Sequence, residues 1–113
     1  MKHVKLRPRI IKVLGRAYVI SYEPPLNLGV PSVGLCDNSN LVIHVLDGQH
    51  PVEEYDTLIH ELLHAIWFIM SIDHGGLDEE SVVRRLASGL TGVFLDNPEL
   101  LAYLQSIKNH SIK

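Results

Sequence analysis

The sequence lacks the features of a secreted or membrane-embedded chain. Cys36 is its single cysteine, which excludes an internal disulfide and favours a reducing compartment. No apolar run follows the basic start, and no apolar stretch approaches the roughly 20 residues that a bilayer span needs. We therefore expect a cytoplasmic protein without a signal peptide and without a membrane partner.

One segment of the sequence lacks acidic residues, and another lacks Lys and Arg. Residues 1–16 carry six basic side chains and no acid, whereas residues 47–80 carry nine acids and no Lys or Arg. A negative field over 47–80 would favour a divalent cation there. The basic segment has no aromatic residues interleaved for base stacking, so we read it as a solvated arm and expect no nucleic-acid partner.

The length of 113 residues suits one domain with a modest core that needs no disulfide. We expect a single domain over 1–113, with 1–9 as a basic N-terminal arm and 108–113 as a C-terminal tail. β-Branched runs between turn residues predict strands, and apolar stripes of helical period predict helices. The expected strands are 10–14, 17–22, 33–36 and 41–46, and the expected helices are 52–70, 79–95 and 98–107. This order predicts an α+β fold, a small antiparallel or mixed sheet followed by three helices.

The most specific motif is His60-Glu61-Leu62-Leu63-His64, which has the H-E-x-x-H spacing of zinc metallohydrolases. Residues four apart share one face of a helix, so both histidines can direct ring nitrogens at one metal ion. Glu61 lies about 100° around the helix, where it can hold and deprotonate a water without ligating the metal. The motif therefore predicts a Zn²⁺ site with His60 and His64 as ligands and Glu61 as the general base.

The residues around the motif are apolar on nearly every side of the predicted helix, and Trp67 falls below the two histidines as a packing residue. Such a helix should be buried. A Glu and two His are costly to bury unless they are paired or bound to metal. This context favours a metal site, and the alternative is a cluster of satisfied core residues.

A catalytic zinc usually takes three protein ligands and leaves the fourth position to water. A metzincin would need Gly at position 67 and His at position 70, where this chain has Trp67 and Met70, so that class is excluded. The remaining candidates are Glu79 and Glu80 in the first turn of the following helix, and His74 in the loop before it. Acids in a first turn are also common through helix-dipole complementarity alone.

Taken in order, several segments resemble the small zincin-like proteins often encoded in phage and prophage genomes. These are minimal relatives of the gluzincin metallopeptidases, loosely similar to ImmA/IrrE-type peptidases. The resemblance runs from about Ile11 to Leu101 and is carried by segments 13–19, 34–37, 41–46, 57–66, 79–90 and 96–98. In similar sequences a Glu followed three positions on by an apolar residue recurs, which here matches Glu80 with Val83. The resemblance implies a zinc-dependent peptidase fold with Glu80 as third ligand, Glu79 as the alternative, and a bacterial host carrying a phage or prophage.

The function expected on this basis is hydrolysis of a peptide or protein by a water that zinc activates. In zincins generally, the substrate lies along an exposed edge strand beside the motif helix, and residues 41–46 are the candidate for that strand. His74 is a further candidate as the group that stabilises the oxyanion. The short chain leaves little room for a substrate-binding subdomain, which favours a narrow substrate. The alternative is a catalytically silent metal-binding module in protein–protein interaction or assembly, although Glu61 favours the enzyme because a structural zinc needs no water-activating base.

Overall fold

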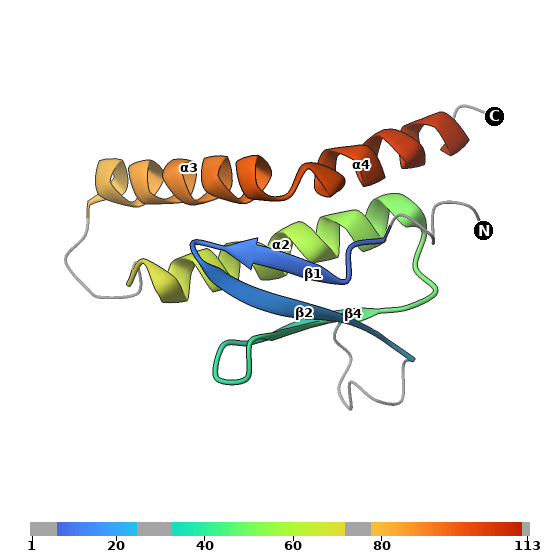
Figure 1. Cartoon of the computed structure of the whole chain (residues 1–113), viewed down its shortest axis with the longest axis horizontal. Helices are drawn as coiled ribbons and strands as arrows, with labels where there is room; N and C mark the ends of the chain where they lie inside the picture. Colours follow the sequence, from blue (N-terminus) through green and yellow to red (C-terminus); the bar gives the residue numbers. More distant parts are fainter. Residues whose placement is uncertain (1–6, 25–32, 72–77, 112–113) are drawn as a thin grey trace.

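Four strands and three helices make up the part of the chain that the structure describes. The structure, a computed structural model, describes residues 7–24, 33–71 and 78–111 (Figure 1). The strands are β1 (Ile10–Val13), β2 (Arg16–Glu23), β3 (Gly34–Asp37) and β4 (Val42–Leu46), and the helices are α2 (Pro51–Ile69), α3 (Glu79–Asp96) and α4 (Pro98–Ser111). The predicted α+β fold is confirmed, and each element lies within a few residues of its expected range.

The sheet is mixed, with the strand order β1-β2-β4-β3. A two-residue turn at Leu14 and Gly15 joins β1 to β2, and both residues have positive φ angles, 51° and 88°. Positive φ at both positions gives a tight turn the twist that antiparallel strands need. β3 and β4 are also antiparallel, whereas β2 and β4 are parallel. Among the described strands, the sheet edges are therefore β1 and β3.

The prediction that 41–46 forms an exposed edge strand is wrong. β4 pairs along one side with β2 and along the other side with β3, so both of its edges are occupied. β3 is the edge strand on that side of the sheet, and it packs beside α2. The apolar, β-branched run at 41–46 marks a strand, but nothing in it says which two strands are its neighbours.

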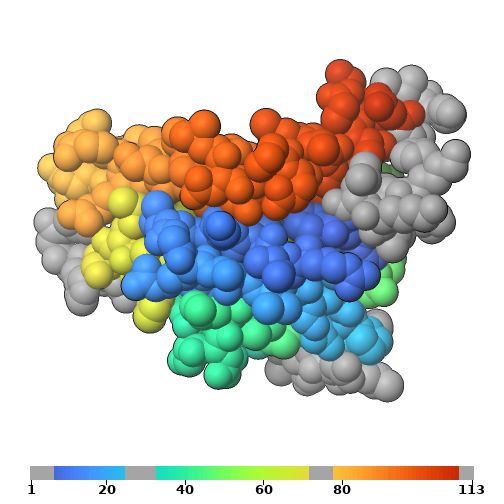
Figure 2. All heavy atoms as spheres, in the orientation of Figure 1, coloured from blue at the N-terminus to red at the C-terminus, as the bar shows by residue number. Residues whose placement is uncertain are grey.

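The helices cover one face and one long side of the sheet. α2 lies behind the sheet in Figure 1, and α3 and α4 follow each other along one side of the molecule. Figure 2 shows α3 and α4, in orange and red, as a band beside the blue strands β1 and β2. The main core lies between the sheet and the helices, and its buried residues are Ile11, Val13, Tyr18, Ile20, Ile43, Val45, Leu58, Leu62, Ala65, Ile66, Val93 and Leu100.

Gly89 within α3 and Asn97 just after its C-terminus fix how this helix docks. A Cβ at Gly89 would lie 2.5 Å from Cγ2 of Ile66, so α3 approaches α2 this closely only because residue 89 has no side chain. At the end of α3, the buried Asn97 side chain accepts a hydrogen bond from the Lys12 N–H (3.0 Å) and donates one to the Lys12 carbonyl (2.8 Å). The amide thereby bonds to the outer edge of β1 as a further strand would, and it joins α3 to the sheet.

The expectation that the motif helix is buried nearly all round is wrong. Both motif histidines are exposed, and Trp67 and Phe68 are 38% and 53% exposed. The sheet covers one side of α2 and the other two helices cover a second side. No described element covers the remaining side, which faces solvent.

Candidate metal centre

The three motif residues lie near the middle of α2, and the helix directs the two histidines and the glutamate to different sides. The helix begins after His50, whose ring accepts a hydrogen bond from the N–H two residues on (3.2 Å). Helical periodicity then places His60 and His64 one turn apart on the solvent side. Glu61 points instead toward the sheet, and only 6% of the residue is exposed. The motif thus presents two accessible imidazoles beside one buried carboxyl group.

The spacing of the histidine pair suits a shared metal ion. The ring centroids of His60 and His64 lie 5.0 Å apart, with the ring planes at 66°. Zn–N bonds of about 2.0–2.1 Å and a tetrahedral angle would place the centroids of two ligating imidazoles about 5 Å apart. The separation of the two rings on α2 is thus the one expected of a histidine pair that shares a zinc ion.

The Glu61 carboxyl group lies between α2 and the edge strand β3. A Cβ at Gly34 would lie 2.7 Å from Oε2 of Glu61 and 3.1 Å from its Cγ, so the carboxyl has room only because β3 carries glycine at this position. Burial raises the pKa of Glu61, while nearby His60 and His64 act to lower it. A raised pKa suits a carboxylate that accepts a proton from water near neutral pH.

A hollow of about 420 Å³ opens between β3 and α2. We call it the motif cleft. Its lining combines the motif with the edge strand: Val33, Gly34, Leu35, Cys36, Asn38, Asp56, Thr57, His60, Glu61 and His64. Its volume lies within the roughly 300–1,000 Å³ of known ligand pockets. The motif residues therefore face a space that a ligand can enter, with an edge strand as its opposite wall.

The β3 wall of the motif cleft holds a small polar chain. Oδ1 of Asn38 accepts hydrogen bonds from the Tyr18 hydroxyl (2.8 Å) and from the Cys36 thiol (3.3 Å). Burial, and secondarily the negative charges of Glu61 and Asp37, raise the pKa of Cys36 to about 11. The thiol is therefore protonated at neutral pH, so a nucleophilic role is not favoured.

Sequence reasoning did not point to Gly34 or Asn38 as site residues. Side chains two apart in a strand point to the same face, so the alternation over 34–37 does place Gly34 and Cys36 together. It does not say that this face meets the motif helix. That contact depends on the packing of β3 against α2, for which the sequence carries no local signal.

Glu79 and Glu80, the predicted third ligands, are exposed in the first turn of α3. In the described parts of the chain, no three His, Cys, Asp or Glu side chains are grouped so that they could hold a metal ion. Ligation by Glu80, with Glu79 as the alternative, stays a prediction. His74, predicted as an alternative ligand and as an oxyanion-stabilising group, lies outside the described residues.

The antiparallel path of α2 and α3 explains where the two glutamates lie. The Arg85 guanidinium donates a hydrogen bond to the carbonyl of Met70, just beyond the end of α2 (3.0 Å). Glu80 precedes Arg85 by five residues, which is about 7.5 Å of helix. The first turn of α3 therefore extends past the C-terminus of α2, and Leu86 is the α3 residue that shares a hollow with the two histidines.

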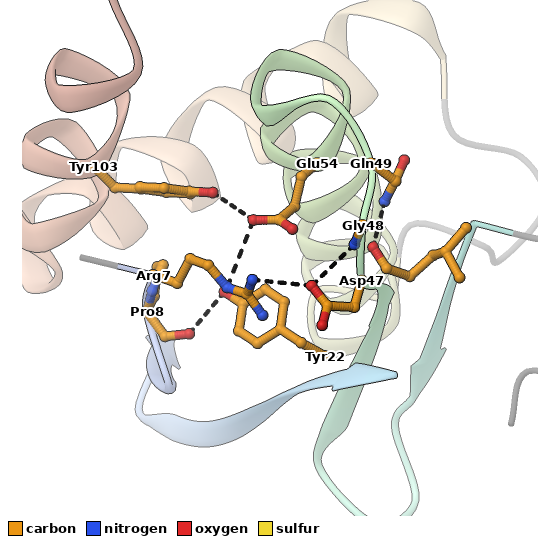
Figure 3. Close-up of polar contacts among 9 residues, drawn as sticks. Arg7, Pro8, Tyr22, Asp47, Gly48, Gln49, Glu54 and Tyr103 are labelled. Carbon is orange, nitrogen blue, oxygen red and sulfur yellow. Dashed lines mark hydrogen bonds and ion pairs between the residues drawn. The ribbon is translucent and has the colours of Figure 1, made fainter. Parts of the chain in front are cut away.

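A separate polar cluster anchors the N-terminal part of α2 (Figure 3). Glu54, 3% exposed, accepts a hydrogen bond from the Tyr103 hydroxyl of α4 and lies 3.7 Å from Nε of Arg7. Arg7 also pairs with Asp47 (3.0 Å), and its guanidinium lies 3.7 Å from the centroid of the Tyr22 ring. None of these residues lines the motif cleft. We therefore assign this cluster to the positioning of α2.

No protein-family model matches the chain, and no match was found among curated proteins or solved structures. The resemblance to small zincin-like proteins therefore stays a prediction that rests on the residues themselves. Within the described ranges, no helix has both the length and the apolar character needed to cross a lipid bilayer.

Proposed function

We propose that the protein is a zinc-dependent metallopeptidase with a narrow range of peptide or protein substrates. One observation carries the proposal: two exposed imidazoles, 5.0 Å apart, stand beside a buried carboxyl group at the wall of a cleft. This combination suits hydrolysis better than a structural zinc site, which would surround the metal with four protein ligands and would need no general base.

His60 and His64 would hold the metal ion in this proposal. Glu80 stays the proposed third ligand, with Glu79 as the alternative, although the first turn of α3 lies past the C-terminus of α2 and would have to move toward the histidines for either to reach the metal. Water would take the remaining position. When bound, zinc would act as a Lewis acid toward this water and toward the carbonyl group of the substrate.

Glu61 is the proposed proton carrier. Its carboxylate takes a proton from the attacking water and delivers it to the amine that leaves. Two features position the residue for this task. α2 fixes its backbone, and the absence of a side chain at Gly34 leaves space for its carboxyl group. His60 and His64 line the same cleft as Glu61.

We propose β3, in place of residues 41–46, as the strand that binds the substrate backbone. β3 is the edge of the sheet that forms the wall of the motif cleft. A peptide that adds to this edge as a further strand, through main-chain hydrogen bonds, would lie beside Glu61 and the histidine pair. Leu35, 54% exposed, would meet side chains on the outer face of such a peptide.

The test is zinc analysis combined with cleavage of a peptide library in the presence and absence of a chelator. Wild type should bind zinc and cleave some peptides, and the chelator should stop cleavage. His60→Ala and His64→Ala should lose both properties. His50→Asn is the matched control, because it removes an exposed histidine at the start of the same helix and keeps a capping side chain.

The other outcomes separate the alternatives. Zinc binding without cleavage of any peptide would favour the catalytically silent binding module. Absence of zinc after purification with excess metal would refute both functions.

A further inference from the structure

A second hollow lies against the same histidine pair. It measures about 330 Å³ and is lined by His60, Leu63, His64, Trp67 and Leu86. No Asp, Glu, Lys or Arg stands among these described lining residues. We call it the apolar hollow, because Leu63, Trp67 and Leu86 give its walls a hydrocarbon and aromatic surface. It lies between α2 and α3, whereas the motif cleft lies between α2 and β3.

The two hollows adjoin the same proposed metal ligands. His60 and His64 line both of them. A peptide whose backbone lies along β3 and whose reacting bond lies at the histidines would therefore have the apolar hollow within reach of a neighbouring side chain. The motif cleft has the backbone of an edge strand along its wall, which suits a peptide backbone, and the apolar hollow across α2 suits a side chain.

Trp67 makes this second part distinctive. It is the only tryptophan of the chain, and it is 38% exposed on the helix that carries the motif. A tryptophan at a surface offers a large, rigid apolar area, which is why the residue is enriched where proteins bind ligands and partners. Its indole is thus placed to contact a substrate side chain beside the reacting bond.

We propose that the apolar hollow binds one large apolar side chain of the substrate, of the leucine, methionine or phenylalanine class, next to the bond that is cut. This inference rests on the proposed peptidase function and names the substrate class for it. The volume of about 330 Å³ is near the lower end of the roughly 300–1,000 Å³ range of ligand pockets, which suits a single side chain better than an extended ligand. Removal of apolar contacts from such a pocket commonly changes selectivity by about 10- to 200-fold.

The first experiment does not depend on activity. Trp67 fluorescence, which in this chain comes from one residue, is followed while zinc-supplemented full-length protein is titrated with N-acetyl-leucinamide or with N-acetyl-glutaminamide. The leucine compound should shift the emission and the glutamine compound should not. Phe68→Ala, which removes an exposed aromatic side chain that does not line the hollow, should behave as wild type.

The second experiment compares cleavage of two peptides that differ only in having leucine or alanine at the position beside the cut. Trp67→Ala should lower the ratio of kcat/KM for the leucine peptide to kcat/KM for the alanine peptide by about tenfold or more. Phe68→Ala should not change this ratio.

These measurements separate failure of the inference from failure of the proposed function. A leucine-specific fluorescence response without cleavage of any peptide would establish the hollow and refute the peptidase. Cleavage with no preference for apolar side chains would overturn the inference and leave the peptidase standing. A Trp67-dependent dimer in sedimentation velocity, with no response to the leucine compound, would also overturn it and assign the surface to a contact between two copies of the chain.

Discussion

Replacing Gly34 by alanine places a methyl group between β3 and α2, where the described structure leaves no space for it. The new Cβ would lie 2.7 Å from Oε2 of Glu61 and 2.8 Å from Cγ2 of Thr57. Rotation of the Glu61 side chain would relieve the first contact but not the second. Relief of the second contact requires either rotation of Thr57, whose hydroxyl donates to the Glu53 carbonyl (2.9 Å), or movement of β3 away from α2, which widens the motif cleft.

The cost follows from the size of this clash. Overpacking of a close contact by one carbon typically destabilises a protein by about 1–3 kcal/mol. For a domain of this length, such a change lowers the Tm by roughly 4–15 °C. Since Glu61 must also change its position, Gly34→Ala should reduce any cleavage activity more than its loss of stability alone would.

The assay is urea unfolding followed by circular dichroism, with Gly92→Ala as the matched control. A Cβ at Gly92 would have its nearest neighbour, Cδ2 of Leu14, at 3.6 Å, an ordinary contact distance. Because alanine is the better helix former, this control should stabilise the protein by about 0.5–1 kcal/mol. The double variant Gly34→Ala/Glu61→Ala should be less destabilised than the sum of its single variants, since the contact with Glu61 is gone.

Two results of the urea unfolding would contradict this reasoning. If Gly34→Ala unfolds at the same urea concentration as wild type, β3 does not approach α2 as described. The argument that glycine makes room for the Glu61 carboxyl would then be refuted. Additive effects in the double variant would exclude a direct contact between positions 34 and 61.

Three further predictions concern the scaffold of the site. Asn97→Ala removes the hydrogen bonds to both main-chain groups of Lys12, so it should destabilise the protein by about 2–4 kcal/mol in urea unfolding. An unchanged midpoint would refute the bridge between α3 and β1. Tyr103→Phe removes a hydrogen-bond donor to the buried Glu54 carboxyl group, so it should lower the free energy of unfolding by about 1–3 kcal/mol in thermal unfolding and leave the zinc content unchanged. Loss of zinc would instead place this cluster in the site. Burial raises the pKa of Cys36 from 9.0 to about 11, so alkylation by iodoacetamide should be slow at neutral pH and should accelerate about tenfold per pH unit between pH 8 and 10. The folded state holds this proton more tightly than the unfolded state, so the stability that the thiol contributes is fully present below about pH 9 and is lost toward pH 11, and Cys36→Ala should show a smaller alkaline decline in urea midpoint.

The elements were predictable from the sequence because each has a local signal. Asp78 caps α3, Asn97-Pro98 separates α3 from α4, and α2 begins at Pro51, one residue before its expected start. The H-E-x-x-H spacing likewise predicted that His60 and His64 share a face, because that follows from helix geometry alone. The turn at Leu14 and Gly15 was expected one residue later in the chain.

Relations between distant segments were not predictable in the same way. The position of β4 inside the sheet depends on a parallel pairing with β2, a strand that is not its neighbour in sequence. The offset of Glu79 and Glu80 from the histidines depends on where α3 crosses α2, which the contact of Gly89 with Ile66 decides. The exposure of the histidine side of α2 depends on how many elements pack against the helix. Periodicity measures the apolar character of a helix and not the number of its neighbours.

The central claim is that Glu61 transfers protons in a zinc-dependent hydrolysis at the His60 and His64 pair. The most direct measurement compares cleavage of one susceptible peptide by wild type and Glu61→Gln at equal zinc content. Equal zinc with a rate about 10²- to 10⁴-fold lower in the variant is the predicted result, the range expected for loss of a general base. Equal rates in the two proteins would contradict the claim.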